Sequence, residues 1–109
     1  MILVKQHCEA VENGNIQVLP KKLAQDYHEQ VPEWTLHQKS LKREFRLKDF
    51  KDSMDFIQRV AAIVEKEGHH PDIQVFYNRV SLQFSTHVLG GITANDFIMA
   101  AKIDELLKS

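Results

Sequence analysis

The spacing of apolar residues changes at Gly68, and this change constrains the fold more than any other feature of the sequence. Before it, apolar residues recur at intervals of three and four, which predicts a helix from about Asp49 to Glu67. Its apolar stripe is expected to contain Phe50, Met54, Ile57, Ala61 and Val64. After it, apolar and polar residues alternate over 73–88, which predicts strands. Gly68 suits the helix end because glycine adopts the left-handed conformation at low cost.

The alternating stretch over 73–88 is predicted to be a hairpin. A two-residue turn at Asn78 and Arg79 would place its apolar side chains on one face of a sheet. The facing pairs would be Tyr77 with Val80, Val75 with Leu82, and Ile73 with Phe84. The opposite face would be polar, with Gln74, Ser81, Gln83, Ser85 and His87.

Shorter elements are predicted before and after this region. Pro20 and a four-residue apolar spacing favour a short helix over 19–27. Apolar and polar residues alternate over 34–36 and again over 45–47, which predicts a hairpin that turns at residues 38–40.

Thr93 and Asp96 form a capping-box pattern, which predicts the start of a last helix. The order of elements is then helix, hairpin, long helix, hairpin, helix. This order predicts an α+β fold, with a four-stranded antiparallel sheet and three helices packed on one face. The other face of the sheet would be open and largely polar.

Composition excludes several classes of function. The 109 residues contain no repeat or linker, so we expect one domain over 1–109, in which residues 1–18 are the least patterned. The 14 basic and 15 acidic residues offer no basic surface for direct nucleic-acid contact. Cys8 is the only cysteine, so no intrachain disulfide can form. The apolar start at residues 1–4 is too short for a signal peptide or membrane span, and we expect a cytoplasmic protein.

His69 and His70 are the first candidates for chemistry. They follow the predicted helix end, where exposed carbonyl groups favour a protonated imidazole, and this alone would explain them. Pro71 restricts His70 to an extended backbone, so the two rings would be held in different directions. Fixed titratable rings are also what general acid–base catalysis requires. On these residues alone, both interpretations stay open.

Three further candidates also have simpler explanations. His87, near the end of the last strand, is either a solvated residue or a catalytic group beside a loop. Asp96 is explained by the capping box. Glu65 is explained as a surface carboxylate, although it lies four residues before His69 and could share its helix face. The other histidines, His7, His28 and His37, are interpreted as surface residues.

Three histidines could instead bind zinc. Metal-binding histidines on a helix usually lie at positions i and i+4, whereas adjacent histidines on a rigid turn diverge. We therefore expect no metal ion at His69, His70 and His87.

Together these residues resemble the signature of the pterin-4a-carbinolamine dehydratases. That signature is an acidic or polar residue, three positions, His-His-Pro, five or six positions, an aromatic, nine positions, a histidine, then eight or more positions and an aspartate. This sequence meets it with Glu65, His69-His70-Pro71, Tyr77, His87 and Asp96. Trp34, the segment FRLKDF, YNRV from Tyr77 and STH from Ser85 also resemble the family, and the similarity covers roughly residues 19–107. Many relatives carry an aromatic residue where this chain has Ile73.

The resemblance implies a hydro-lyase that converts 4a-hydroxytetrahydrobiopterin to quinonoid dihydropterin in tetrahydrobiopterin recycling, without metal or organic cofactor. His70 and His87 would be the acid–base pair near the 4a-hydroxyl group, and His69 would bind substrate and handle protons. The supporting residues would be Glu65 and Asp96, which orient imidazoles, and Pro71 and Tyr77, which contact the pterin.

The resemblance also implies partners. Besides the pterin substrate, it implies a homodimer or homotetramer, and exposed edge strands favour such pairing. The alternative function is that of a dimerisation cofactor for a homeodomain transcription factor.

Overall fold

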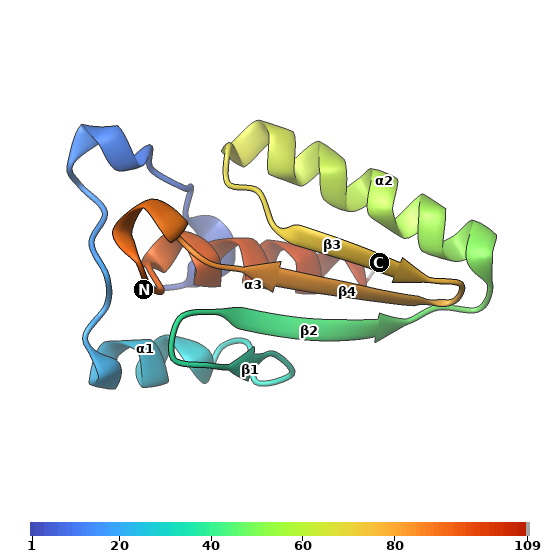
Figure 1. The fold of residues 1–109 in the computed structure, drawn as a ribbon, viewed down its shortest axis with the longest axis horizontal. Coiled ribbons are helices and arrows are strands. Elements are labelled where there is room, and N and C mark those ends of the chain that lie inside the picture. Colours follow the sequence, from blue (N-terminus) through green and yellow to red (C-terminus); the bar gives the residue numbers. More distant parts are fainter. Residues whose placement is uncertain (109) are drawn as a thin grey trace.

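The structure, a computed structural model, describes residues 1–108. In this range one antiparallel sheet has the strand order β1-β2-β4-β3. The strands are β1 (Thr35–Leu36), β2 (Leu41–Arg46), β3 (Asp72–Phe76) and β4 (Arg79–Phe84). Helices α1 (Lys21–His28), α2 (Phe50–Glu67) and α3 (Ala94–Leu106) pack on one face of it (Figure 1). Short 3-10 helices are η1 (Leu3–Lys5), η2 (Val11–Asn13) and η3 (His87–Leu89). The predicted α+β fold is confirmed.

The core lies between the sheet and α3. Strand alternation directs Leu41, Phe45, Val80, Leu82 and Phe84 toward the helices, and all are buried. Helix α3 is buried at residues 95–101 and at 103. Its position is therefore set by packing on nearly every side, which also fixes the polar residues at its start.

The two ends of α2 form as predicted. The Asp49 carboxylate accepts a hydrogen bond from the Asp52 N–H, which caps the start of the helix. At the other end Gly68 is left-handed, with φ of 76°, and its N–H donates to the Val64 carbonyl. Gly68 thus turns the chain out of the helix just before the histidine pair.

The predicted apolar stripe of α2 is wrong except at Val64 and, in part, Ile57. The buried residues are Ser53, Phe56, Val60 and Val64, whereas Phe50, Met54 and Ala61 are exposed and Ile57 is half-buried. The reason is Ser53, whose hydroxyl lies within hydrogen-bond distance of the carbonyls of Asp49 (3.1 Å) and Tyr77 (2.7 Å). A satisfied hydroxyl can be buried, and the apolar pattern alone does not count it.

The turn of the second hairpin is also shifted from its predicted place. It lies at Tyr77 and Asn78, so Val75 faces Val80 and Ile73 faces Leu82. Tyr77 takes a positive φ of 54°, which is uncommon for a bulky residue. The Ser53 hydroxyl donates to the Tyr77 carbonyl, and the Leu47 N–H donates to the Asn78 carbonyl at 2.8 Å. These contacts with the neighbouring elements stabilise the turn.

The last predicted strand ends early. Strand β4 stops at Phe84, and His87 lies in η3 instead of on the strand. The N-terminal residues, although weakly patterned, pack on the domain, and Leu3 is fully buried. Within residues 1–108, no helix combines the length and apolar character needed to cross a membrane.

Candidate active site

Three segments meet at one end of the sheet, and the first is distant in sequence from the other two. The α2–β3 connection, which carries His69 and His70, lies there with η3 and the start of α3 (Figure 1). The β3–β4 turn lies at the opposite end (Figure 1). Two short turns and a helix start therefore build the site, each set by a glycine or a capping box.

The closest contact in the site joins His69 to Asp96. The His69 Nε2 atom lies 2.6 Å from the Asp96 Oδ1 atom. The Asp96 side chain is fully buried and that of His69 is 12% exposed. The His69 ring stacks on Phe84, with centroids 5.9 Å apart and planes at 17°. Packing and hydrogen bonding together hold this ring in one orientation.

The hydrogen-bond partner determines which nitrogen of His69 carries a proton. An ionised carboxylate only accepts hydrogen bonds, so Nε2 must be the donor toward Asp96. In the neutral ring, the lone pair then lies on the Nδ1 atom of His69. This arrangement is suited to proton transfer at Nδ1.

Asp96 is itself held by two threonines that the sequence reasoning did not single out for the site. Its Oδ2 atom accepts from the Thr93 N–H at 2.9 Å and from the Thr86 hydroxyl at 3.0 Å. The two threonine hydroxyls lie 2.8 Å apart, and both residues are buried. The predicted capping box is confirmed, and the same carboxylate holds both the helix start and His69. Thr86 could have been found from its place directly before His87.

His70 is paired with Glu65 instead of with the buried network. Its Nε2 atom lies 2.7 Å from Glu65 Oε2, and both side chains are mostly exposed. Sequence spacing favoured a shared face for Glu65 and His69, but the left-handed turn at Gly68 breaks the helical relation. Solvent screens an exposed pair of this kind, so it orients His70 only weakly.

His87 is exposed in η3, and none of the described contacts of residues 1–108 involves its imidazole. Its backbone follows Thr86, which bonds to Asp96, so it belongs to the same end of the sheet. The structure therefore brings the segments of all three predicted histidines together, but it links only His69 to a buried acid.

Pro71 and Tyr77 do not lie together. Pro71 leads into β3 and lines an open hollow of about 600 Å³, with Lys42, Asp72, Ile73, Gln74, Ser81 and Gln83. Tyr77 is in the turn at the far end of β3 and stacks on Phe50, with ring centroids 6.5 Å apart. The strand thus separates Tyr77 from the histidines.

Two groups beside the pair have shifted pKa values. Burial, with the charges of Glu67 and Asp96, raises the pKa of the Cys8 thiol to about 12, against the opposing charge of Lys102. Burial acts to raise the pKa of Glu67, but hydrogen bonds from Cys8 and His7 and the charge of Lys102 together lower it. Cys8 is thus a protonated thiol and Glu67 a carboxylate at neutral pH.

The side-chain arrangement also bears on metal binding. Among residues 1–108 no group of three or more His, Cys, Asp or Glu side chains has the arrangement needed to hold a metal ion.

Comparison with known proteins identifies the family. The sequence model described as pterin 4 alpha carbinolamine dehydratase matches residues 17–106. A mitochondrial pterin-4-alpha-carbinolamine dehydratase 2 of Arabidopsis thaliana is 41% identical over 95% of the chain, and the match spans 58% of the Arabidopsis protein. A putative pterin-4-alpha-carbinolamine dehydratase of Methylococcus capsulatus is 40% identical over 95% of the chain and 92% of its own length.

A solved structure gives the same result. The transcriptional coactivator/pterin dehydratase of Brucella melitensis superposes with a TM-score of 0.78, at 28% identity, over 83% of this chain and 98% of its own. These matches confirm the resemblance found in the sequence and indicate pterin-4a-carbinolamine dehydratase activity. The buried histidine–aspartate pair and its surroundings thus lie in a chain that belongs to the pterin-4a-carbinolamine dehydratase family.

Proposed function

We propose that this chain is a hydro-lyase that dehydrates 4a-hydroxytetrahydropterins through histidine acid–base catalysis. The observation that carries the proposal is the His69–Asp96 pair, in which a buried carboxylate holds Nε2 and leaves Nδ1 for proton transfer. The proposed site also includes His70 and His87, with Glu65 as an orienting group and Pro71 as a pterin contact. Tyr77 lies at the far end of β3, away from these residues, and is not included.

The proposed reaction needs two proton transfers. The bond between C4a and the hydroxyl oxygen breaks, an acid gives that oxygen a proton, and water leaves. A base takes a proton from the ring nitrogen, and the electrons form the new double bond to C4a. The exposed rings of His70 and His87 are free to approach the leaving oxygen, while His69 handles the proton of the ring nitrogen.

The test is the rate at which single-histidine variants form quinonoid product from synthetic 4a-hydroxytetrahydropterin in a stopped-flow instrument. His70→Ala and His87→Ala should each fold but lose about 10²-fold in rate, the usual scale for one acid–base group. His37→Ala, a change at an exposed histidine between β1 and β2, is the control and should keep the wild-type rate. Wild-type turnover in either site variant would remove that residue from the proposed mechanism.

Self-association is a second part of the proposal. β3 is an edge strand with unpaired backbone groups along one side. Exposed apolar side chains lie on it, in the turn that follows and on α2: Ile73, Phe76, Tyr77, Phe50 and Met54. We propose that a second copy covers this edge, in a homodimer or homotetramer. Light scattering should give an oligomer mass for the wild type and a lower mass for Ile73→Lys, and a monomeric wild type would contradict this.

The alternative function is that of an interaction protein that assists a transcription factor. It is favoured by the name of the Brucella structure, which includes a transcriptional coactivator. A pull-down from cell extract with the His70→Ala variant separates the two functions, since a coactivator keeps its protein partner without the histidine. The cytoplasmic location stays a prediction, and the name of the Arabidopsis relative places that protein in mitochondria.

A further inference from the structure

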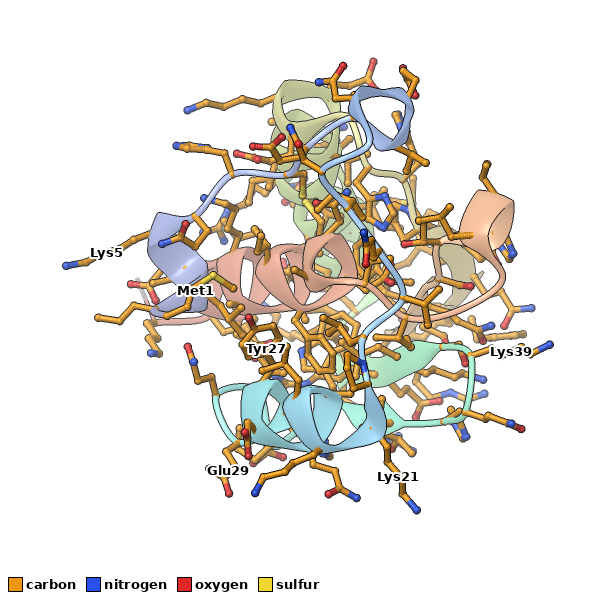
Figure 2. The ribbon with its side chains drawn as sticks, turned by 90° about the vertical axis from the view of Figure 1, so that its left-hand side faces the viewer. Met1, Lys5, Lys21, Tyr27, Glu29 and Lys39 are labelled. Carbon is orange, nitrogen blue, oxygen red and sulfur yellow. The ribbon has the colours of Figure 1, made fainter. Side chains whose placement is uncertain are left out.

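The first 16 residues precede the region that the family model matches, yet they are held tightly. Figure 2 shows this N-terminal segment passing along α3 and then running from the side of α2 to the start of α1. Polar side chains from the rest of the chain bond to its backbone at several points: Gln30, Glu67, Asn95 and Lys102. Terminal segments are poorly ordered unless such contacts hold them, so these hydrogen bonds fix the position of the segment on the domain.

Two adjacent residues of this segment join the ends of two helices. The Cys8 N–H donates to Glu67 Oε1 at 2.8 Å. The Glu9 N–H donates to Asn95 Oδ1 at 3.0 Å, and Asn95 Nδ2 donates to the Glu9 carbonyl at 2.8 Å. Glu67 is the last residue of α2 and Asn95 lies in the first turn of α3. We call these contacts the N-terminal staple.

The two helix residues of the N-terminal staple, Glu67 and Asn95, lie close in sequence to His69 and Asp96. Glu67 lies two residues before His69, and Asn95 directly precedes Asp96. Both are well suited to fix position, because the Glu67 side chain is 4% exposed and Asn95 is 2% exposed. The Asp96 charge contributes to the raised pKa of Cys8, which agrees with its closeness to the pair.

We propose that the N-terminal staple sets the relative position of His69 and Asp96, and that Asn95 and Glu67 are positioning residues for the dehydration. The proposal rests on the proposed function only for its effect on rate. Its physical basis is that proton transfer tolerates errors of only about half an ångström, so loss of a support near the pair is costly.

Gln30 provides a matched control on the same segment. It also makes two hydrogen bonds to the segment backbone, accepting from the Leu3 N–H at 3.0 Å and donating to the Met1 carbonyl at 2.6 Å. Gln30 follows α1, and its two bonds go to Met1 and Leu3 instead of to Cys8 and Glu9. A purely structural role for the segment predicts the same outcome for Asn95→Ala and Gln30→Ala.

The experiment compares these two variants by stopped-flow kinetics and by NMR of the His69 Nε2 proton. Asn95→Ala should lower kcat about tenfold with little change in KM, and should broaden or shift the Nε2 proton signal. Gln30→Ala should lose similar stability but keep kcat and the signal. Equal kcat and an equal His69 signal in the two variants would overturn the proposal.

A second pair of variants, at Glu67, tests the staple even if Asn95→Ala does not fold. Glu67→Ala removes the acceptor for the Cys8 N–H, whereas Glu67→Gln keeps one. Glu67→Gln should restore most of the His69 signal and of kcat that Glu67→Ala loses, and no such difference would contradict the staple. The NMR signal separates the two proposals, because it reports the staple even if the wild type shows no dehydratase activity.

Discussion

Replacing Asp96 by asparagine changes the buried contact between His69 Nε2 and Asp96 Oδ1. It tests whether the proton of His69 is on Nε2. Asp96 Oδ2 accepts from the Thr93 N–H and from the Thr86 hydroxyl, so the amide oxygen must take that place. The amide nitrogen then faces His69 Nε2, where the carboxylate Oδ1 stood. Because an amide nitrogen only donates, His69 would have to carry its proton on Nδ1.

The magnitude follows from this change of tautomer. A neutral His69 with its proton on Nδ1 has no lone pair there to accept the substrate proton. The loss of one acid–base group is about 10²-fold or more in rate, or about 2.7 kcal/mol of transition-state stabilisation. Stability should fall by only about 1 kcal/mol, because the amide oxygen keeps the bonds to both threonines and a neutral bond replaces a charged one.

The assay is stopped-flow formation of quinonoid dihydropterin, with chemical denaturation as the measure of stability. Glu65→Gln serves as the comparison, because it makes the same chemical change at the exposed His70 pair. An exposed pair is worth up to about 1 kcal/mol, so its rate should fall about fivefold at most. An Asp96→Asn variant that folds and turns over like the wild type would refute the proton assignment.

Further predictions concern the surroundings of the site. Gly68→Ala should lower the free energy of unfolding by about 1 kcal/mol, because its φ of 76° strains any side chain, and unchanged denaturation would contradict this. With the pKa of Cys8 at about 12, its thiolate fraction at neutral pH is about a thousandfold below that of an exposed cysteine, so thiol reagents should modify it slowly in the folded protein and rapidly after denaturation. The pKa of Glu67 is lowered in the folded state, so the unfolded state binds more protons in acid. The stability that Glu67 contributes is present above its unfolded pKa and is lost as the pH falls through its folded pKa. The free energy of unfolding of Glu67→Gln should therefore fall less steeply in acid than that of the wild type. An equally steep fall in the two proteins would contradict this.

Local signals predicted the elements of this fold well. The capping box of Thr93 and Asp96 and the glycine end of α2 depend on neighbours in sequence, and both are confirmed. Period changes likewise gave the order of helices and strands. The buried face of α2 failed because Ser53 is satisfied by a carbonyl 24 residues away, which no local pattern contains.

The sequence did not show which residues of the site bond to each other, because most of these bonds join residues that are distant in sequence. The sequence motif contained His69 and Asp96, but the bond between them spans 27 residues, and Glu65 is paired with His70 instead. Thr86 lies directly before His87 in the STH segment, but its bond to Asp96 spans 10 residues. Asn95 carries no unusual local pattern, and its contacts arise from packing at the start of α3. The exposed Tyr77 turn was missed because a non-glycine residue with positive φ is a rare choice.

Dehydratase activity that depends on the buried His69–Asp96 pair is tested most directly by the rate of quinonoid formation from synthetic 4a-hydroxytetrahydropterin. This rate is measured with no protein, with the wild type and with His69→Ala. We expect the wild type to accelerate the reaction in proportion to its concentration, and His69→Ala to lose about 10²-fold or more of this rate. A wild-type rate equal to the reaction without protein would contradict the proposed function, and full activity of His69→Ala would contradict the role of the buried pair.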